Sequence, residues 1–488
     1  MIKKILFTTI KKKQKHIQYF CLSLILILGL VFRLYKINSP VADWHSWRQV
    51  DTASVSLNYY QNGINLLFPK YHDVSSIQTG YNNPEGLRFV EFPIFNLLHV
   101  FLYRMYDGFS FETTGRIVSI VSALITTVGM YFVGRKLIGP WGGVIAAGFY
   151  SMNPYNVFFT RVILPEPLAV CFAVLSFLFF IYFIEKENTL SLFSSAVFFS
   201  LAMLVKPFSI FYILPYFYLA VKKYGLIGVF QNKKLLLAID VALIPFFLWR
   251  YWMNNFVRGI PHFTWAFNGD KIRFKPSFWM WLFGERVSHL ILGYWGLIPF
   301  GFGLVHRSVN NALRMLLLGM FLYVSVIATA NVRHDYYQTF LIPAIGLVFA
   351  QGIVIMCGSK EANKFVGVSL AIFSFIMMEL LGVYQIREFY KINDPSIVLA
   401  GTEADRVLPK DAMVIAPYNG STAFLYQTKR WGWPVVDTSI DEMIERGADY
   451  YLSVNTGDID SVNFKNKFKT VVEKKEYLIL DLHSRTED

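Results

Sequence analysis

The sequence predicts an all-α polytopic membrane protein with about eleven transmembrane helices, interfacial helices and a small α/β domain at the C-terminus. Three observations support this prediction. The 488 residues are 55% hydrophobic and only 16% charged, unlike a soluble globular chain. Apolar runs close to the ~20 residues that cross a bilayer recur along the chain. Basic residues are distributed over the connections between these runs as a membrane topology requires.

The apolar runs define a transmembrane region over residues 1–390. They carry almost no charge, and two of them contain a single acid, Asp240 and Glu379. We expect one membrane-crossing helix from each of the eleven runs. They are 17–32, 117–134, 137–160, 167–184, 188–205, 207–221, 235–249, 290–305, 315–332, 336–359 and 365–386.

Basic residues predict the orientation. The segments expected inside, from 1–16 to 360–364, hold 17 Lys and Arg, whereas the three short outside loops hold 3. This asymmetry follows the positive-inside rule, so we expect the N-terminus inside and, after eleven spans, the C-terminal domain outside. The net charge of +13 is explained by this distribution, and we expect no nucleic-acid partner. No small-residue cleavage site follows the first run, which predicts an uncleaved helix.

Two external loops, 33–116 and 250–289, interrupt the spans. The first contains an apolar patch at 92–106. Counting this patch as a span would invert every later loop, so we interpret it as an interfacial or re-entrant helix. The second loop interleaves Trp and Phe with Arg and Lys. This composition suits a lipid headgroup, and it also suits an anchoring amphipathic helix.

The composition changes from about residue 391. Residues 391–488 carry 12 Lys and Arg against 16 Asp and Glu. Short β-rich runs at 413–416, 450–453 and 477–482 alternate with a helical stretch at 440–446. Turns are predicted at Asn419-Gly420 and Arg446-Gly447. We expect a soluble extracytoplasmic α/β domain, and no catalytic motif occurs in its sequence.

The segment DWHSWRQVD, from Asp43 to Asp51, is the strongest functional signal. It places two carboxylates, a histidine, an arginine and two tryptophans just beyond the first span. An interfacial anchor would explain the tryptophans and Arg48, but not the acids or His45. Reaction chemistry at a membrane surface explains them, with a base, a cation for phosphate and aromatic faces for a sugar or lipid.

Further ionisable residues fall on the predicted outer side, where each needs a reason because charge near a membrane is costly. Plainer interpretations exist: Glu91 as a helix cap, Arg161 and Glu166 as a structural ion pair, and 333–335 as a solvated loop. Their convergence on one side favours a common cavity. The residues are Glu91, Arg161, Glu166, Lys206, Arg333, His334 and Tyr336.

Four short motifs together resemble the membrane-embedded C-type glycosyltransferases. They are Asp43 in the first external loop, Glu91-Phe-Pro, the Arg-x4-Glu of Arg161–Glu166, and the His-x-Tyr-Tyr that begins at His334. The most similar branch is related to protein O-mannosyltransferases and lipid A aminoarabinose transferases, a glycosyltransferase family 39-like group. The resemblance covers roughly the first 390 residues. The family often has an acidic pair where this chain has Asp43-Trp44, and a lysine where it has Phe92.

The resemblance implies inverting transfer of a hexose or pentose from a polyprenyl-phosphate carrier to a glycan, lipid or protein acceptor. It implies a site on the outer face of a membrane, and we expect the bacterial cytoplasmic membrane. Asp43 is the candidate base, and Glu91 and Glu166 would orient the acceptor or hold a divalent cation with Asp43. The candidates for binding the donor and its phosphate are His45, Arg48, Arg161, Lys206, Arg258, Arg333, His334 and Tyr336.

Cofactor use stays open at this point. Neither Asp-x-Asp nor a His/Cys ligand spacing is present, so a divalent metal is possible but not indicated. The three cysteines, Cys21, Cys171 and Cys357, all lie within predicted spans, so we expect neither a disulfide framework nor a Cys-based metal site.

Three other functions compete. A transporter or flippase of lipid-linked sugars would place its charges at mid-membrane in repeated halves, and no halves match here. A lipid-linked glycan polymerase or ligase would depend on arginines in a large late loop, and 250–286 keeps that alternative open. A non-enzymatic assembly scaffold would leave Asp43, Glu91 and Glu166 free to mutate.

Overall fold

The computed structural model describes residues 2–358 and 363–486. The chain folds into two compact units. We call the first the helical unit; it comprises Met1–Ile37, Arg116–Trp249 and Phe263–Arg387. The second, the mixed unit, comprises Asn38–Gly115, Arg250–His262 and Glu388–Asp488. The mixed unit therefore combines most of the first predicted external loop with the start of the second and with the C-terminal segment.

Within the described residues, six helical segments are long and apolar enough to cross a membrane. They are Gln14–Leu34 of α1 (Ile2–Leu34), α4 (Phe111–Leu137), α7 (Glu166–Lys186), Pro207–Gln231, α10 (Lys233–Met253) and Lys364–Tyr390. Pro207–Gln231 joins η1 (Pro207–Tyr212) to α9 (Ile213–Gln231), and Lys364–Tyr390 joins α17 (Lys364–Ile386) to η6 (Arg387–Tyr390). Four apolar helices are shorter: α3 (Ile94–Met105), α8 (Thr189–Val205), α14 (Asn311–Val326) and α16 (Ile342–Gly358). The count of eleven spans therefore stays a prediction.

Local backbone chemistry interrupts several apolar runs that hydropathy alone reads as continuous. The run 137–160 forms α5 (Pro140–Met152) and α6 (Pro154–Phe159). Asn153 between them is extended, with φ −48° and ψ 119°, because the residue before a proline avoids the helical region. In the run 290–305, Gly293 and Tyr294 have positive φ, so α13 spans only Leu297–Val305.

Two later runs are also divided. The run 315–332 passes from α14 to α15 (Ala328–Arg333) through the non-helical Ile327. The run 336–359 begins in the 3₁₀-helix η5 (Asp335–Phe340) before α16. Residue 359 and residues 360–362 of the predicted inside connection lie outside the described part of the chain.

The remaining elements are α2 (Ser46–Asn62), η2 (Val257–Gly259), α11 (Trp265–Asn268), η3 (Ile272–Phe274), α12 (Pro276–Trp279) and the π-helix η4 (Met280–Ile291).

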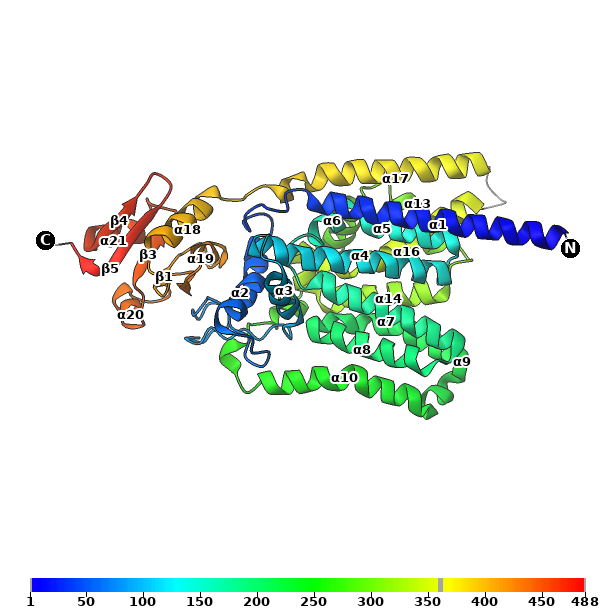
Figure 1. Cartoon of the computed structure of the whole chain (residues 1–488), viewed down its shortest axis with the longest axis horizontal. Helices are drawn as coiled ribbons and strands as arrows, with labels where there is room; N and C mark the ends of the chain where they lie inside the picture. The colour runs from blue at the N-terminus through cyan, green and yellow to red at the C-terminus, as the bar shows by residue number, and fades with distance from the viewer. Residues whose placement is uncertain (1, 359–362, 487–488) are drawn as a thin grey trace. The chain divides into compact units, whose positions relative to one another are not determined.

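Small residues let the helices of the helical unit approach closely. α5 packs on α1 and α16, α7 packs on α8, and α13 packs on α16, as Figure 1 shows for the long helices. A Cβ atom at Gly352 would lie 1.7 Å from the Pro299 carbonyl oxygen, and one at Gly303 would lie 2.0 Å from the Val348 carbonyl oxygen. Glycines at these crossings are typical of helix contacts in membranes, where close backbone packing replaces the hydrophobic driving force.

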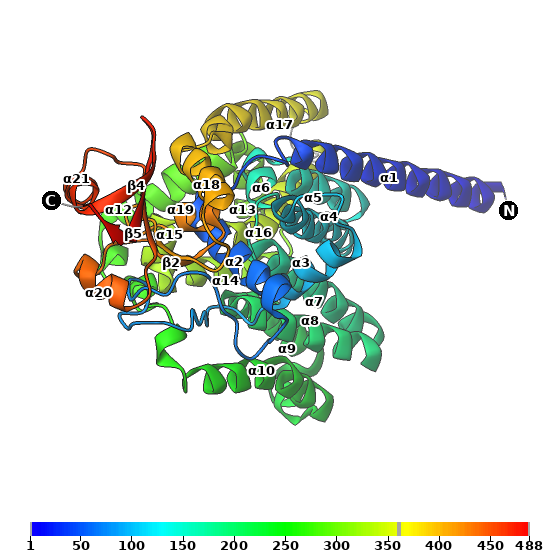
Figure 2. The ribbon, with the colours of Figure 1, turned by 60° about the vertical axis from the view of Figure 1, so that its left-hand side comes forward.

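The C-terminal part of the mixed unit is a five-stranded sheet with helices around it (Figure 2). Its strands, in the order β2-β1-β3-β5-β4, are β1 (Met413–Ile415), β2 (Trp431–Trp433), β3 (Tyr450–Ser453), β4 (Phe468–Glu473) and β5 (Leu478–Arg485). β1 is parallel to β2 and β3, and β5 is antiparallel to β3 and β4. The helices are α18 (Pro395–Val407), α19 (Ala423–Thr428), α20 (Ile440–Glu445) and α21 (Ile459–Lys467). The predicted mixture of strands and helices at the C-terminus is confirmed, whereas a separate domain over residues 391–488 stays a prediction.

The first external loop adds to the edge of this sheet. Val74 N–H donates to the Gly432 carbonyl at 3.0 Å, and Gly432 N–H donates to the His72 carbonyl at 2.9 Å. Val74 also enters the hydrophobic core under the sheet, beside Ile415 and Trp433. The loop and the C-terminal sheet therefore share one core within the mixed unit.

Candidate functional site

In the mixed unit, Asp43 is buried directly before α2 and is held on both its side chain and its backbone. His45, with φ 54°, turns the chain into the helix. Gln49, in the first turns of α2, donates from Nε2 to Asp43 Oδ1 at 2.6 Å. Asn393 donates from Nδ2 to the Asp43 carbonyl at 3.0 Å, and from its N–H to the Ala42 carbonyl. Gln49, 6 positions away in the chain, therefore fixes the direction of the carboxylate, and Asn393, 350 positions away, holds the backbone that carries it.

Arg48, five positions after Asp43 in the chain, forms an ion pair with Glu91. The Arg48 side chain is 5% exposed and the Glu91 side chain 15% exposed. Arg48 also donates to Thr52 Oγ1 at 3.2 Å, one turn along α2. The structure thus pairs two residues that the sequence proposed for the site, Arg48 and Glu91, while Asp43 bonds to Gln49, the residue after Arg48.

A second ion pair one turn further along α2 joins Asp51 to Arg88. Arg88 Nη2 lies 2.6 Å from Asp51 Oδ2, and both side chains are buried. Asp51 Oδ1 accepts from Thr422 Oγ1 at 2.7 Å, so α2 is tied to the residue that precedes α19. Asp51 is quoted in the DWHSWRQVD motif, but sequence reasoning gave it no role, and it did not identify Arg88.

Two buried titratable residues of the first loop lie close to this network. His72 shares a hydrogen bond of 2.5 Å between Nδ1 and Ser54 Oγ, and burial lowers the pKa of His72 to about 4. Burial raises the pKa of Asp73 to about 6, although hydrogen bonds from Ser75 oppose this shift. Both groups are therefore neutral in the folded protein over a shared range of pH.

In the helical unit, Glu166 and Lys206 form a buried ion pair. Glu166 is the first residue of α7 and Lys206 follows the last residue of α8, and these two helices pack together. Lys206 Nζ lies 2.9 Å from Glu166 Oε1 and 6.0 Å from the centre of the Tyr337 ring. An acid at a helix N-terminus is also favoured by the helix dipole. The pairing explains how a lysine that sequence reasoning treated as a lone cation is accommodated.

Arg161 caps a helix. Its Nη1 donates to the carbonyls of Tyr35 at 3.1 Å and Lys36 at 2.9 Å, directly after the end of α1. The carbonyls at a helix C-terminus lack intrahelical partners, so a buried guanidinium there stabilises the helix end. Arg161 consequently has a structural function that the sequence did not reveal.

The segment before α16 holds a further group of site candidates. Arg333 pairs with Asp270 at 3.0 Å, and both side chains are about half exposed. His334 stacks on Tyr336 with ring centres 5.6 Å apart and meets the edge of Trp265. Between them in sequence, the buried Asp335 pairs with Arg286 at 3.3 Å. Arg286, from the second predicted external loop, is a cation that the candidate list did not contain.

The predicted site residues thus belong to both units. Asp43, His45, Arg48, Glu91 and Arg258 belong to the mixed unit, where Arg258 is exposed on η2. The others, in the helical unit, are Arg161, Glu166, Lys206, Arg333, His334 and Tyr336. Across the described residues, no group of three or more His, Cys, Asp or Glu side chains could hold a metal ion. We assign no step to a metal.

Comparison with known proteins supports the fold. The family model for dolichyl-phosphate-mannose-protein mannosyltransferase matches residues 94–252. No curated protein matches the sequence. Among solved structures, ArnT from Cupriavidus metallidurans bound to undecaprenyl phosphate is 11% identical with a TM-score of 0.64 and covers 94% of this chain and 97% of its own.

Two further structures extend the comparison. The Archaeoglobus fulgidus oligosaccharyltransferase is 10% identical with a TM-score of 0.58, and the match covers 92% of this chain and 71% of that one. The mycobacterial arabinofuranosyltransferase AftD is 13% identical with a TM-score of 0.52, and the match covers 94% of this chain and 41% of AftD. At these identities the likeness shows the fold. The expected resemblance to the membrane-embedded C-type glycosyltransferases is confirmed.

Proposed function

We propose that this chain, an integral membrane protein with the fold of the C-type glycosyltransferases, moves one sugar from a polyprenyl-phosphate carrier to an acceptor hydroxyl. The acceptor is a glycan, a lipid or a protein. The observation that carries the proposal is the buried Asp43, whose carboxylate is held by Gln49 and whose backbone is held by Asn393, within a fold shared with ArnT over 94% of this chain. Undecaprenyl phosphate is bound in that ArnT structure, which supports a lipid phosphate as the carrier here.

In the proposed reaction, the Asp43 carboxylate takes the proton of the acceptor hydroxyl as its oxygen attacks the sugar C1. The bond between C1 and the phosphate oxygen breaks, and its electron pair stays on the lipid phosphate. Attack opposite the leaving group inverts the configuration at C1. A positioned base contributes about 10²–10⁴-fold to such a step. Burial and the Gln49 hydrogen bond keep the carboxylate in one direction, as this role requires.

The leaving phosphate gains charge as the bond breaks, and cations stabilise it. Arg333 is the candidate cation because its guanidinium is about half exposed and its ion pair, with Asp270, is also about half exposed. His334, the next residue in the chain, stacks on Tyr336. Glu91 and Glu166 act in this proposal through the cations that they pair, Arg48 and Lys206.

The proposal places the reaction on the outer face of a bacterial cytoplasmic membrane. Its basis is the distribution of 17 basic residues over the predicted inside segments against 3 over the short outside loops. The N-terminus would then lie inside, and the C-terminal sheet would lie outside with the loop that carries Asp43.

The test uses the full chain in lipid nanodiscs with radiolabelled undecaprenyl-phosphate mannose and undecaprenyl-phosphate glucose, and a membrane extract as acceptor. The proposal expects one of the donors to yield undecaprenyl phosphate and a labelled acceptor. If the intact donor instead crosses the bilayer of a proteoliposome uncleaved, the flippase alternative replaces it. Binding of undecaprenyl phosphate without turnover of either donor or of other polyprenyl-phosphate sugars would contradict an enzymatic role.

A further inference from the structure

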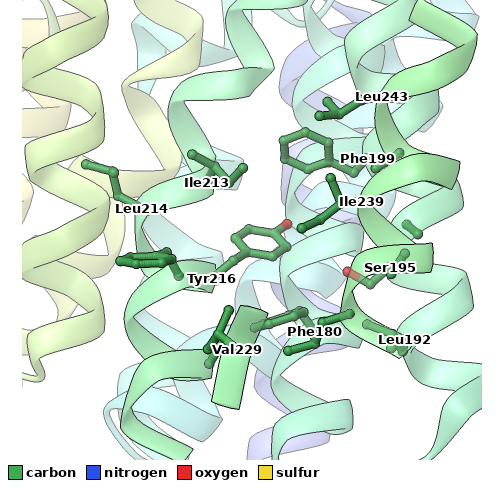
Figure 3. Close-up of a pocket in the computed structure, with 16 residues that line it drawn as sticks. Phe180, Leu192, Ser195, Phe199, Ile213, Leu214, Tyr216, Val229, Ile239 and Leu243 are labelled. Atoms are coloured by element: carbon green, nitrogen blue, oxygen red, sulfur yellow. The ribbon is translucent and has the colours of Figure 1, made fainter. Parts of the chain in front are cut away.

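The helical unit contains an apolar cavity of about 270 Å³ that the proposed reaction does not use. Figure 3 shows aliphatic and aromatic side chains converging on it from α7, α8, α9 and α10. Two lining residues carry hydroxyls, and both hydroxyls form hydrogen bonds to Ser176 within the protein. Ser195 Oγ donates to the Ser176 carbonyl at 2.9 Å, and Tyr216 OH donates to Ser176 Oγ at 2.9 Å. The walls therefore suit a hydrocarbon chain rather than a polar ligand.

One wall of the cavity, α10, packs loosely. Its buried residues Leu235, Ala242 and Trp249 recur every seven positions, and Met253 follows one turn later, so the buried face of α10 is one narrow stripe. Beside that stripe Leu237 is 64% exposed and Ile239 is 46% exposed. Ala238 and Ile239 line the cavity from α10. An exposed apolar helix surface in a membrane protein faces lipid, so a lipid chain has access to the space next to α10.

Lysines surround one end of the cavity. The lining residues Leu192 and Leu235 lie within one turn of Thr189 and Lys234, and Lys234 Nζ is 3.4 Å from Thr189 Oγ1. The segments 185–187 and 222–234 that meet there hold five lysines and two glutamates. One of these lysines, Lys223, pairs with Glu187 at 2.9 Å. This end of the cavity therefore carries net positive charge at the point where a lipid headgroup would lie.

We propose that the cavity binds one acyl chain of an anionic phospholipid, whose phosphate lies against Lys233 and Lys234. Basic pockets between transmembrane helices on one face are typical sites for anionic headgroups, each basic residue near the surface contributing about fivefold in affinity. The site is distinct from the proposed donor site. α8 separates Thr189 from Lys206 by 17 residues, which is roughly 25 Å of helix.

The experiment measures phosphatidylglycerol and phosphatidylcholine retained by the full chain in detergent, by native mass spectrometry. Ala238→Trp fills the cavity from α10, and Ala242→Phe does so independently. Leu237→Trp places the same side chain on the exposed side of α10 and serves as the control. Lys233→Gln with Lys234→Gln removes the headgroup charges. Arg307→Gln, an exposed cation between α13 and α14, controls for net charge.

The proposal expects wild type to retain phosphatidylglycerol in preference to phosphatidylcholine. It expects both cavity-filling variants to lose this lipid while Leu237→Trp keeps it. The lysine variants should weaken retention about fivefold per lysine, and Arg307→Gln should not. Equal retention of the two lipids, or equal loss in Ala238→Trp and Leu237→Trp, would overturn it. Displacement of the phospholipid by undecaprenyl phosphate would also overturn it, because the carrier chain would then be the occupant.

Discussion

Asp51 on α2 and Arg88 in the first external loop form a buried ion pair, with Arg88 Nη2 2.6 Å from Asp51 Oδ2. The same carboxylate accepts a hydrogen bond from Thr422 at 2.7 Å. Arg88 also lies over the Tyr71 ring, 4.8 Å from its centre. Residues from three distant parts of the sequence therefore converge on one carboxylate, eight positions after Asp43 in the chain.

Arg88→Met should strongly destabilise the mixed unit. It removes the cation and leaves the Asp51 carboxylate buried without its counter-charge, which costs about 3–5 kcal/mol. Adding Asp51→Asn should recover part of this loss, because the amide is neutral and its oxygen still accepts from Thr422. Limited proteolysis at increasing urea concentrations measures the unfolding of this unit. Wild-type resistance in Arg88→Met would show that the pair contributes nothing to its stability.

The His72–Asp73 pair predicts a compensated pH dependence of stability. Folding lowers the pKa of His72 from 6.5 to about 4, so its stabilisation is present above pH 6.5 and is lost as the pH falls through 4. Folding raises the pKa of Asp73 from 3.8 to about 6, so its stabilisation is present below pH 3.8 and is lost as the pH rises through 6. Between pH 4 and 6 the two contributions oppose each other.

A variant that lacks one of the two groups should show the pH dependence of stability that the remaining group causes. Relative to wild type, His72→Gln should lose stability as the pH rises from 4 to 6, and Asp73→Asn should gain it. Each slope approaches about 1.4 kcal/mol per pH unit. Thermal unfolding in detergent across this range measures both. Parallel curves for the two variants and wild type would contradict the assigned protonation states.

Gly352→Ala should disrupt the packing of α16 against α13. The new Cβ would lie 1.7 Å from the Pro299 carbonyl oxygen, so one backbone must move, at a cost of about 1–3 kcal/mol or more. Gly301→Ala, on α13 itself, has nothing within 4 Å of the new Cβ and serves as the control. Melting temperatures in detergent compare them. Equal melting temperatures for Gly352→Ala and Gly301→Ala would contradict the close contact between α16 and α13.

Arg333→Ala should weaken binding of undecaprenyl phosphate without unfolding the protein. The exposed pair with Asp270 contributes only about 0–1 kcal/mol to stability, whereas a charge-assisted contact to phosphate contributes about 1.5–3 kcal/mol to binding. Asp270→Ala breaks the same pair but keeps the cation, so it should bind at least as tightly as wild type. Microscale thermophoresis with undecaprenyl phosphate separates the two. Equal affinities in both variants would remove Arg333 from the donor site.

The sequence predicted the helical regions well because a bilayer demands long apolar stretches, which composition alone reveals. The interruptions were harder to predict. The bend at Asn153 follows from Pro154, which can be recognised in the sequence, whereas the non-helical Ile327 has no local signal. In the C-terminal domain, β1, β3 and β5 coincide with predicted apolar runs. β2 and β4 were missed: Trp431–Trp433 is short and contains a glycine, and Phe468–Glu473 mixes charged with apolar residues.

For the candidate site, the sequence indicated residue types and one dense motif, but not partners. Arg48 and Glu91 were named separately, and the structure pairs them across 43 positions. The ion-pair partners of Asp51 and Lys206 lie 37 and 40 positions away, and Thr422, which donates to Asp51, lies 371 positions away. Such contacts depend on how helices and loops pack, and no local pattern encodes them. Arg161 is a further example, because its short motif does not indicate its hydrogen bonds to the carbonyls after the end of α1.

The central claim, that Asp43 is the base, is tested most directly by the turnover of purified Asp43→Asn. The amide keeps the shape of the side chain but removes its charge and basicity. Asp107→Asn, an exposed aspartate between α3 and α4, is the matched control. The account predicts that Asp43→Asn inserts in the membrane, binds undecaprenyl phosphate as wild type does and loses about 10²–10⁴-fold in sugar transfer, while Asp107→Asn keeps it. Near-normal transfer by Asp43→Asn would contradict the mechanism.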